Sequence, residues 1–335
     1  MPVTTPHQVE QPVTKTPCRV AALTPPAPGA VSILQLHGDI DPVLQSITGR
    51  SQWTVGEIRL CDLAGIDRGL VSIPAADTAQ VMPHGGIRIR QRLLEAITRS
   101  GASLDTSMTP AELFPEARDL IEASAMQVMT QAASPLAIDL LLQQSERWAD
   151  CVKWTEQDES RSKRLNRLIE PPNVVICGPA NIGKSSLLNT LAGRDVAIAV
   201  DQPGTTRDYV SGLVELGGLT VRWHDTPGQR DTGDQIERDA IERSDRLITE
   251  ADMLISTRDM GSKWHTLERQ PDLLLSLRCD LGLCQDADVC VSSVTGEGLI
   301  ELVECVREHL VPIADLGSTR PWRFPGLEVP GALNG

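Results

Sequence analysis

Aromatic and basic residues are both scarce in this chain. Its 335 residues include one Tyr, two Phe and six Trp, and 31 Lys and Arg face 45 Asp and Glu, for a formal net charge of −14. Proteins that bind single-stranded nucleic acids stack bases on aromatic side chains, and generic phosphate-backbone binders carry an excess of positive charge. Any contact with RNA must therefore be local.

Long apolar runs, a secretory leader and paired cysteines are missing as well. No apolar stretch approaches the roughly 18 residues of a membrane helix, and MPVTTPHQVEQPVTKTPC lacks a basic region followed by an apolar one. The eight cysteines form no CxxC pair, and Cys279, Cys284 and Cys290 match no common zinc spacing. We expect a cytoplasmic protein with reduced thiols that does not span a membrane.

The hydrophobic pattern of the first half changes twice. Residues 1–28 are rich in Pro and Thr and predict a flexible lead-in. Residues 29–95 mix short apolar runs with Gly and Pro, which indicates a small α/β domain. Residues 96–170 form a helical segment with a capping box at 109–112, followed by a helix that begins at Ser134 and Pro135 and runs past Trp148 towards Leu168.

The second half alternates strand-like and helix-like stretches. Residues 171–315 predict a mainly parallel sheet covered by helices on both faces, and residues 316–335 form a Pro- and Gly-containing tail without periodicity. One basic cluster, RSKRLNR at 161–167, precedes this region. It is typical of a solvated helix face, and a local nucleic-acid contact is the alternative.

A phosphate-binding loop opens the predicted parallel sheet. Gly178, Gly183, Lys184 and Ser185 satisfy G-x-x-x-x-G-K-[ST], directly after the strand NVVIC and before the helix SSLLNTLAG. Glycines allow backbone N–H groups to surround phosphate oxygens, the lysine reaches the outer phosphates, and the serine hydroxyl can bind Mg²⁺. The stretch predicts a bound nucleoside triphosphate.

Two further motifs follow in the order that GTPases use. Residues 204–208, GTTRD, form a loop that can close a threonine hydroxyl onto the metal. The sequence DTPG, from Asp225 to Gly228, ends the strand LTVRWHD, where the carboxylate can reach the Mg²⁺ shell and the glycine N–H the γ-phosphate. An ordinary turn would explain DTPG alone, but the three motifs together indicate a GTPase switch.

These stretches resemble one known family. GPANIGKSSLLNTLAG, DQPGTTRD, DTPGQRDTGDQIERDAIERS and SSVTGEG are similar to the MnmE (TrmE) tRNA-modification GTPases, a branch of the Era-like GTPases. Weaker upstream matches are TPPAPGAVSILQLHG, PHGG and PEARDLIEASAMQ. The resemblance implies a P-loop G domain after a TrmE-like domain, a homodimer, an MnmG-type flavoprotein partner and modification of wobble uridine in tRNA.

The resemblance also implies residue roles. Glu237 would orient the attacking water, with Lys184 and Asn181 as the other catalytic residues. The Mg²⁺ ligands would be Ser185, Thr206 and Asp225, and the K⁺ ligands Asn181, Val200, Gln202 and Thr205. The implied GTP contacts are Asn181, Ile182, Gly183, Lys184, Ser185, Ser186, Thr205, Thr206, Asp225, Gly228, Arg278, Asp280, Ser292 and Ser293.

Three departures from the family pattern limit these expectations. Its Asn-Lys-x-Asp motif is replaced by Leu277-Arg278-Cys279-Asp280, so Asp280 and the stem of Arg278 can still recognise guanine, but more weakly. Gln35 and Ala117 stand where the family has charged folate contacts, so folate is not expected as a cofactor. The family's C-x-G-K ending is absent from GALNG.

Two other functions compete with GTP hydrolysis. Leu277 favours a degenerate GTP-dependent switch or interaction module with little turnover and no role in tRNA modification. Asn181 and Glu237 argue against that alternative. An ATPase would have no reason to keep Asp280, because its carboxylate opposes the N1 acceptor of adenine.

Overall fold

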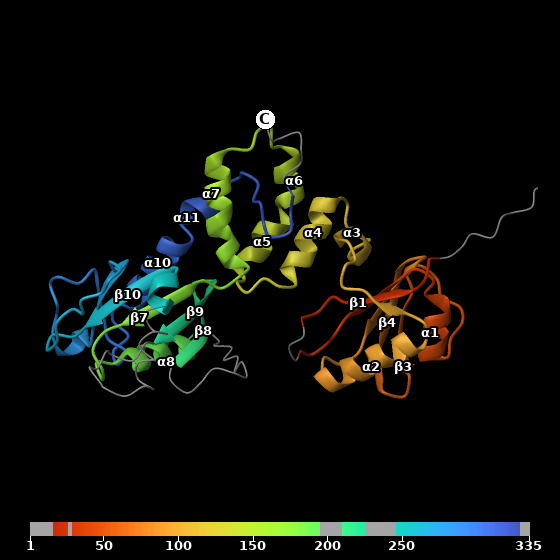
Figure 1. Cartoon of the computed structure of the whole chain (residues 1–335), viewed down its shortest axis with the longest axis horizontal. Coiled ribbons are helices and arrows are strands. Elements are labelled where there is room, and N and C mark those ends of the chain that lie inside the picture. Colours follow the sequence, from red (N-terminus) through yellow and green to blue (C-terminus); the bar gives the residue numbers. More distant parts are fainter. Residues whose placement is uncertain (1–15, 26–28, 195–209, 226–245, 329–335) are drawn as a thin grey trace, which may run out of the picture. The chain divides into compact units, whose positions relative to one another are not determined.

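The computed structural model describes residues 16–25, 29–194, 210–225 and 246–328 (Figure 1). The chain divides into two compact units, residues 1–130 and 131–335. The division falls inside the predicted helical segment 96–170, whose first part packs with the first unit and whose second part packs with the GTPase region. None of the described helices is long and apolar enough to cross a membrane.

A six-stranded mixed sheet forms the first unit. Its strands lie in the order β3-β4-β5-β2-β1-β6, antiparallel except for the parallel pair β1 and β6. The strands are β1 (Arg19–Ala22), β2 (Leu34–His37), β3 (Ile58–Leu63), β4 (Asp67–Ala75), β5 (Thr78–Met82) and β6 (Ser103–Leu104).

Alternation along β1 separates the two faces of this sheet. Val20 belongs to a large core with α1 (Asp41–Thr48) and α2 (Ile87–Arg99), whereas Ala21 packs with α3 (Pro110–Leu113) and α4 (Leu120–Met129). Successive strand side chains point to opposite faces, so each face buries its own apolar set. The predicted capping box is confirmed, since the Thr109 backbone N–H donates to the Glu112 carboxylate at 2.8 Å.

The helix predicted from Ser134 to Leu168 is interrupted. The structure has α5 (Leu136–Leu142), α6 (Gln144–Ala149), α7 (Glu156–Leu165) and the 3₁₀ turn η1 (Asn166–Leu168). The break precedes a second capping box, in which Thr155 accepts from the backbone N–H of Asp158 at 3.2 Å and donates its hydroxyl to the Asp158 carboxylate at 2.6 Å. The prediction of one continuous helix was wrong because this cap restarts the helix.

The second sheet has the architecture that the sequence predicts. Its order is β12-β11-β10-β7-β9-β8, and every pair is parallel except β8 with β9. The strands are β7 (Asn173–Cys177), β8 (Val210–Leu216), β9 (Leu219–Asp225), β10 (Met253–Arg258), β11 (Leu273–Leu277) and β12 (Val289–Val291), with helices α8 (Lys184–Arg194), α10 (Leu299–Leu310) and α11 (Ile313–Leu316).

Residues 317–328, which we call the strap, pack against the helices of the second unit. Trp322 and Phe324 are 0% and 1% exposed, and the strap runs between α6 and α7 (Figure 1). The Trp322 backbone N–H donates to the Gln144 side chain at 2.7 Å, and the Trp148 indole donates to the Trp322 carbonyl at 3.2 Å. Side chains of the helices thus form hydrogen bonds with the backbone of the strap, which is irregular and whose sequence shows no periodicity.

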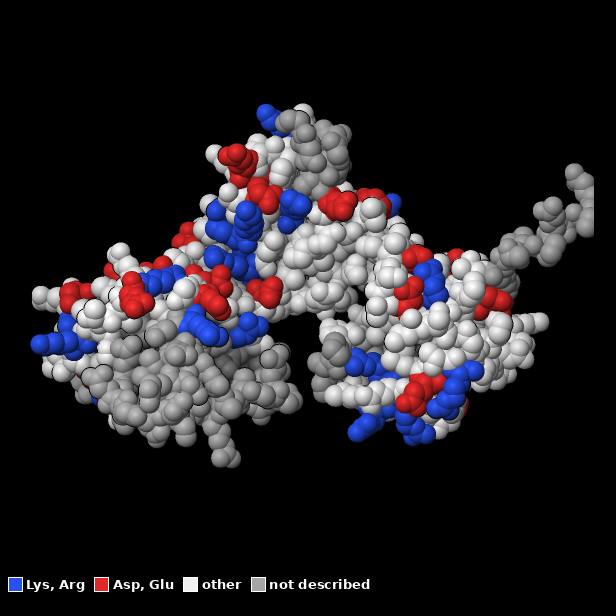
Figure 2. All heavy atoms as spheres, in the orientation of Figure 1, with Lys and Arg blue, Asp and Glu red and all other residues white. Residues whose placement is uncertain are grey.

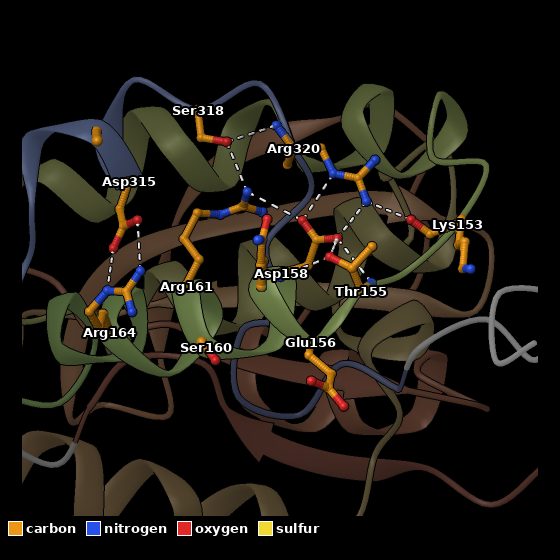
Figure 3. Close-up of a pocket in the computed structure, with 12 residues that line it drawn as sticks. Lys153, Thr155, Glu156, Asp158, Ser160, Arg161, Arg164, Asp315, Ser318 and Arg320 are labelled. Carbon is orange, nitrogen blue, oxygen red and sulfur yellow. Dashed lines mark hydrogen bonds and ion pairs between the residues drawn. The ribbon is translucent and has the colours of Figure 1, made fainter.

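The arginines of the basic cluster at 161–167 do not form a solvated helix face, although Lys163 is exposed. Lys and Arg side chains gather over α7 in Figure 2. In Figure 3, Arg161 contacts the strap, Arg164 contacts α11, and Arg320 of the strap contacts α7. Arg161 is 7% exposed and donates to the Ser318 hydroxyl at 2.8 Å, while Arg164 grips Asp315 at 2.6 and 3.0 Å. The prediction of a solvated face was wrong because these arginines bind partners that lie about 150 positions further along the chain.

Asp158 lies among the contacts that join α7 to the strap. It lines a pocket of about 830 Å³ and accepts from Arg320 Nε at 2.9 Å. Burial raises its pKa, but the hydrogen bonds from Arg320 and Thr155 and the charge of Arg320 outweigh burial and hold the pKa at about 2. A carboxyl whose folded-state pKa is depressed stabilises the protein above its unfolded pKa, and that stabilisation is lost as the pH falls through the folded pKa.

We therefore expect Asp158→Asn to lower the free energy of unfolding at pH 7 by about 2 kcal/mol. The difference from wild type should shrink as the pH falls from 3.8 to about 2. Urea unfolding at several pH values measures both quantities. The control is Glu159→Gln, which removes an exposed pair with Arg323 and should cost at most about 1 kcal/mol; equal losses in the two variants would contradict the prediction.

Candidate functional site

The phosphate loop lies where the strand order of the second sheet reverses. From β7 the chain forms β8 and β9 on one side of that strand and then β10 on the other. Loops at the carboxyl end of β7 therefore diverge, which is the position where open α/β sheets bind their ligands. Residues 178–183 leave β7 at this point and lead into the N-terminus of α8.

Backbone geometry explains the glycines of the loop. A Cβ atom on Gly178 would lie 2.2 Å from the Thr257 hydroxyl and 2.3 Å from its carbonyl oxygen, so only glycine fits beside β10. Gly183 has φ +107° and Asn181 has φ +63°, a left-handed conformation that asparagine tolerates better than most residues. The loop is thus bent so that its N–H groups can face an anion.

Lys184, the first residue of α8, contacts the backbone of this loop. Its side chain is 7% exposed, and its Nζ donates to the carbonyl oxygens of Gly178 at 3.1 Å and Pro179 at 2.9 Å. Burial lowers the pKa of the ammonium, and the nearby Asp225 carboxylate opposes this shift. A polyphosphate would supply the negative charge that favours the protonated form.

Ser185 and Asp225 bring two oxygen ligands together. The Ser185 hydroxyl donates to Asp225 Oδ2 at 2.6 Å, which joins the first turn of α8 to the end of β9. Hydroxyl and carboxylate oxygens are ligands that Mg²⁺ accepts beside substrate phosphates. The pair therefore fits the Mg²⁺ site that the sequence predicts, with Lys184 Nζ 4.0 Å from Asp225 Oδ1.

The base-recognition segment follows β11. Arg278 has φ +56°, and its Nη2 donates to the Asn181 carbonyl at 2.5 Å, so this residue lies against the phosphate loop. Asp280 is exposed in the turn η2 (Cys279–Leu281), whereas Leu277 is 2% exposed within the sheet. Ser292 is buried, and its hydroxyl accepts from the backbone N–H groups of Val294 and Thr295 at 3.2 Å each.

The remaining predicted site residues fall into two groups. Ile182, Ser186 and Ser293 lie in the described part of the loop, helix α8 and the segment after β12. Six others fall outside the described residues, namely Val200, Gln202, Thr205, Thr206, Gly228 and Glu237. The K⁺ site, including Asn181, and the water-orienting glutamate therefore remain predictions.

Sequence reasoning missed two residues that shape the site. Thr257 fills the space beside Gly178 and donates to the Cys177 carbonyl at 2.9 Å, and Asp259 lies 3.6 Å from Arg278. Both follow the apolar residues of β10 in the stretch STRD, which matches no motif. The one available signal was their place at the carboxyl end of a strand in a parallel sheet.

Comparison with known proteins agrees with this geometry. Residues 173–278 match the family model of the 50S ribosome-binding GTPases. The tRNA modification GTPase MnmE of Akkermansia muciniphila is 30% identical over 312 residues, covering 74% of this chain and 69% of that protein. MnmE of Methylobacterium radiotolerans is 30% identical over 306 residues, covering 72% and 69%.

Among solved structures, Era of Aquifex aeolicus bound to GDP and AlF₄⁻ aligns with a TM-score of 0.34 and 25% identity, over 42% of this chain and 56% of that one. The family assignment rests on the MnmE relatives, whose similarity extends beyond the G domain into the first unit. With the phosphate loop, the Ser185–Asp225 pair and the Arg278–Asp280 segment in place, the chain is a P-loop GTPase and belongs to the MnmE family of tRNA modification GTPases.

Proposed function

We propose that this protein hydrolyses GTP with the help of K⁺ and acts in the cytoplasm on tRNA. The observation that carries the proposal is the pairing of Ser185 with Asp225 at 2.6 Å next to Lys184, which brings the proposed metal and phosphate ligands together. A bound Mg²⁺ and K⁺ would neutralise charge that develops on the phosphates.

In this proposal, residues of the chain position the phosphates, the K⁺ ion and the attacking water. Lys184 would move its Nζ from the Gly178 and Pro179 carbonyls to the outer phosphates, and the N-terminus of α8 would face them with its N–H groups. Asn181 lies in the loop with its backbone carbonyl bonded to Arg278, and its side-chain oxygen would be the K⁺ ligand. Glu237 would orient the water that attacks the γ-phosphate in line.

The proposed partners have two sources. The curated relatives are named tRNA modification GTPases, which supports tRNA as the substrate of this chain. The homodimer, the MnmG-type flavoprotein and the wobble uridine are what the resemblance of the sequence motifs implies. The proposal includes no folate cofactor, because Gln35 and Ala117 stand where the resemblance implies charged folate contacts. Gln35 is 0% exposed, and its amide donates to the Glu112 carbonyl at 3.0 Å.

The proposal predicts Mg²⁺-dependent phosphate release from GTP that is faster in K⁺ than in Na⁺ by on the order of 10-fold or more. ATP should be a poor substrate in both salts. Asn181→Ala should remove the preference for K⁺, because it deletes a proposed ligand. The control is Asn189→Ala, an exposed asparagine of α8, which should behave like wild type.

Phosphate release should be measured at saturating nucleotide, together with the dissociation constants for GTP and ATP. Equal rates in the two salts would remove the role of K⁺ while leaving GTP hydrolysis intact. Tight GTP binding without any phosphate release would instead favour an interaction module over an enzyme.

A further inference from the structure

The base-recognition segment lacks the asparagine that would connect it to the phosphate loop. Leu277 takes that position, and its side chain is 2% exposed at the end of β11, where it pairs in register with Val291. An apolar side chain buried in a sheet offers no hydrogen bond. Some other residue must hold the segment of Arg278 and Asp280 against the loop that binds phosphates.

Arg278 makes that connection directly. Its Nη2 donates to the carbonyl oxygen of Asn181 at 2.5 Å, and its Nε would lie 3.8 Å from a Cβ atom on Gly183. The other end of the guanidinium faces Asp259, with Nη1 3.6 Å from Oδ2. The arginine therefore bridges the phosphate loop and the residue that follows β10.

The segment 258–264, which we call the bracing loop, is itself held in place. Asp259 and Ser262 close a tight turn, with the Asp259 N–H donating to the Ser262 hydroxyl at 3.0 Å and the Ser262 N–H to the Asp259 carbonyl at 3.2 Å. This turn limits the positions open to the Asp259 carboxylate. It thereby presents a preorganised partner to Arg278.

Two more contacts join the bracing loop to the base-recognition segment. Met260 covers Gly282, where a Cβ atom would lie 2.2 Å from the Met260 sulfur. Arg258 pairs with Asp286 and lies 4.9 Å from the Trp264 ring, whose indole N–H also donates to Asp286 at 2.8 Å. The bracing loop thus contacts residues 278–286 at three separate points.

We propose that Asp259 is a positioning residue for guanine nucleotides, which holds Arg278 across the phosphate loop and so replaces the connection that Leu277 cannot make. The inference rests on the GTPase function. Because the side chains of Arg278 and Asp259 are 45% and 20% exposed, their ion pair should contribute little to folding stability. Its effect should fall on nucleotide affinity, since an arginine that is already positioned loses less side-chain entropy on binding.

The test compares dissociation constants for GTP and GDP among single and double variants. Asp259→Asn should weaken both nucleotides by roughly 3- to 10-fold, with little change in the unfolding midpoint. Asp259→Glu, which keeps the charge, should recover part of the loss. The control is Lys263→Ala, an exposed residue of the same loop, which should bind like wild type.

A double-variant cycle separates positioning from a general effect on the loop. In an Arg278→Ala background, Asp259→Asn should weaken binding no further, because the arginine that it positions is gone. Unchanged affinity in Asp259→Asn, or losses that simply multiply in the double variant, would overturn the inference while the GTPase function stands. A wild-type protein that binds no guanine nucleotide would overturn both.

Discussion

Glu237→Ala is expected to slow GTP hydrolysis by roughly 10²- to 10⁴-fold, the range for loss of a positioned general base or water-orienting group. Nucleotide affinity should stay close to that of wild type, because the residue is proposed to contact the attacking water rather than GTP. Single-turnover phosphate release at saturating GTP, combined with titration of a labelled nucleotide, measures the two effects separately.

The same segment offers a matched control. Glu242 lies five residues further along DQIERDAIERS and is expected to be solvated, so Glu242→Ala should hydrolyse GTP at the wild-type rate. Full activity in Glu237→Ala would remove the assignment. Equal losses in both variants would point to a general disturbance of the segment instead of a role for one carboxylate.

Lys184→Ala is expected to reduce hydrolysis by roughly 10²- to 10³-fold, because it removes a charged donor from the place where negative charge develops. GTP affinity should fall as well, since the ammonium also contacts the ground-state phosphates. Lys184 is buried with a lowered pKa, so removing the cation should not unfold the protein. Single-turnover kinetics, GTP titration and the unfolding midpoint together measure these expectations.

Two further variants make the result for Lys184 specific. Lys184→Met keeps the volume of the aliphatic stem without the charge and should be as slow as Lys184→Ala. Lys163→Ala removes an exposed lysine of α7 and should leave turnover unchanged. Near-normal turnover in Lys184→Met would show that the stem, and not the ammonium, carries the effect.

The G domain is the part of the fold that the sequence predicts best. Its strands are short and apolar, and its helices alternate with them, so local pattern and tertiary structure agree. The phosphate loop was equally predictable from the sequence. Its backbone geometry requires glycine at positions 178 and 183, and this requirement appears in the sequence as a motif. Ser185 and Asp225, which two separate motifs predict as Mg²⁺ ligands, lie within hydrogen-bond distance of each other in the structure.

The helical region was less predictable for a physical reason. Hydrophobic spacing continues from α6 towards α7, but the cap formed by Thr155 and Asp158 overrides it. The basic cluster after this cap looked solvated because its partners, Asp315, Ser318 and Pro321, lie about 150 residues away. Charge pairs at such separation leave no local signal in one sequence.

The strap and the bracing loop escaped prediction for a related reason. Both are irregular segments whose backbones are satisfied by side chains, such as Gln144 for Trp322 and Ser262 for Asp259. Periodicity describes regular elements only. Trp322 and Phe324 were nevertheless a usable hint, since two of the chain's few aromatic residues stand close together in a stretch rich in proline and glycine.

The strap has a consequence for the order in which the protein forms on the ribosome. Helices α6 and α7 are synthesised before the GTPase sheet, yet their interior contains Trp322, which pairs with Gln144 across 178 positions. Domains generally fold as they emerge, and contacts between such distant positions form late because a long loop must first close. Until translation has passed the entire GTPase domain and delivered the strap, Gln144, Trp148 and Ser162 therefore lack the hydrogen-bond partners that the strap supplies.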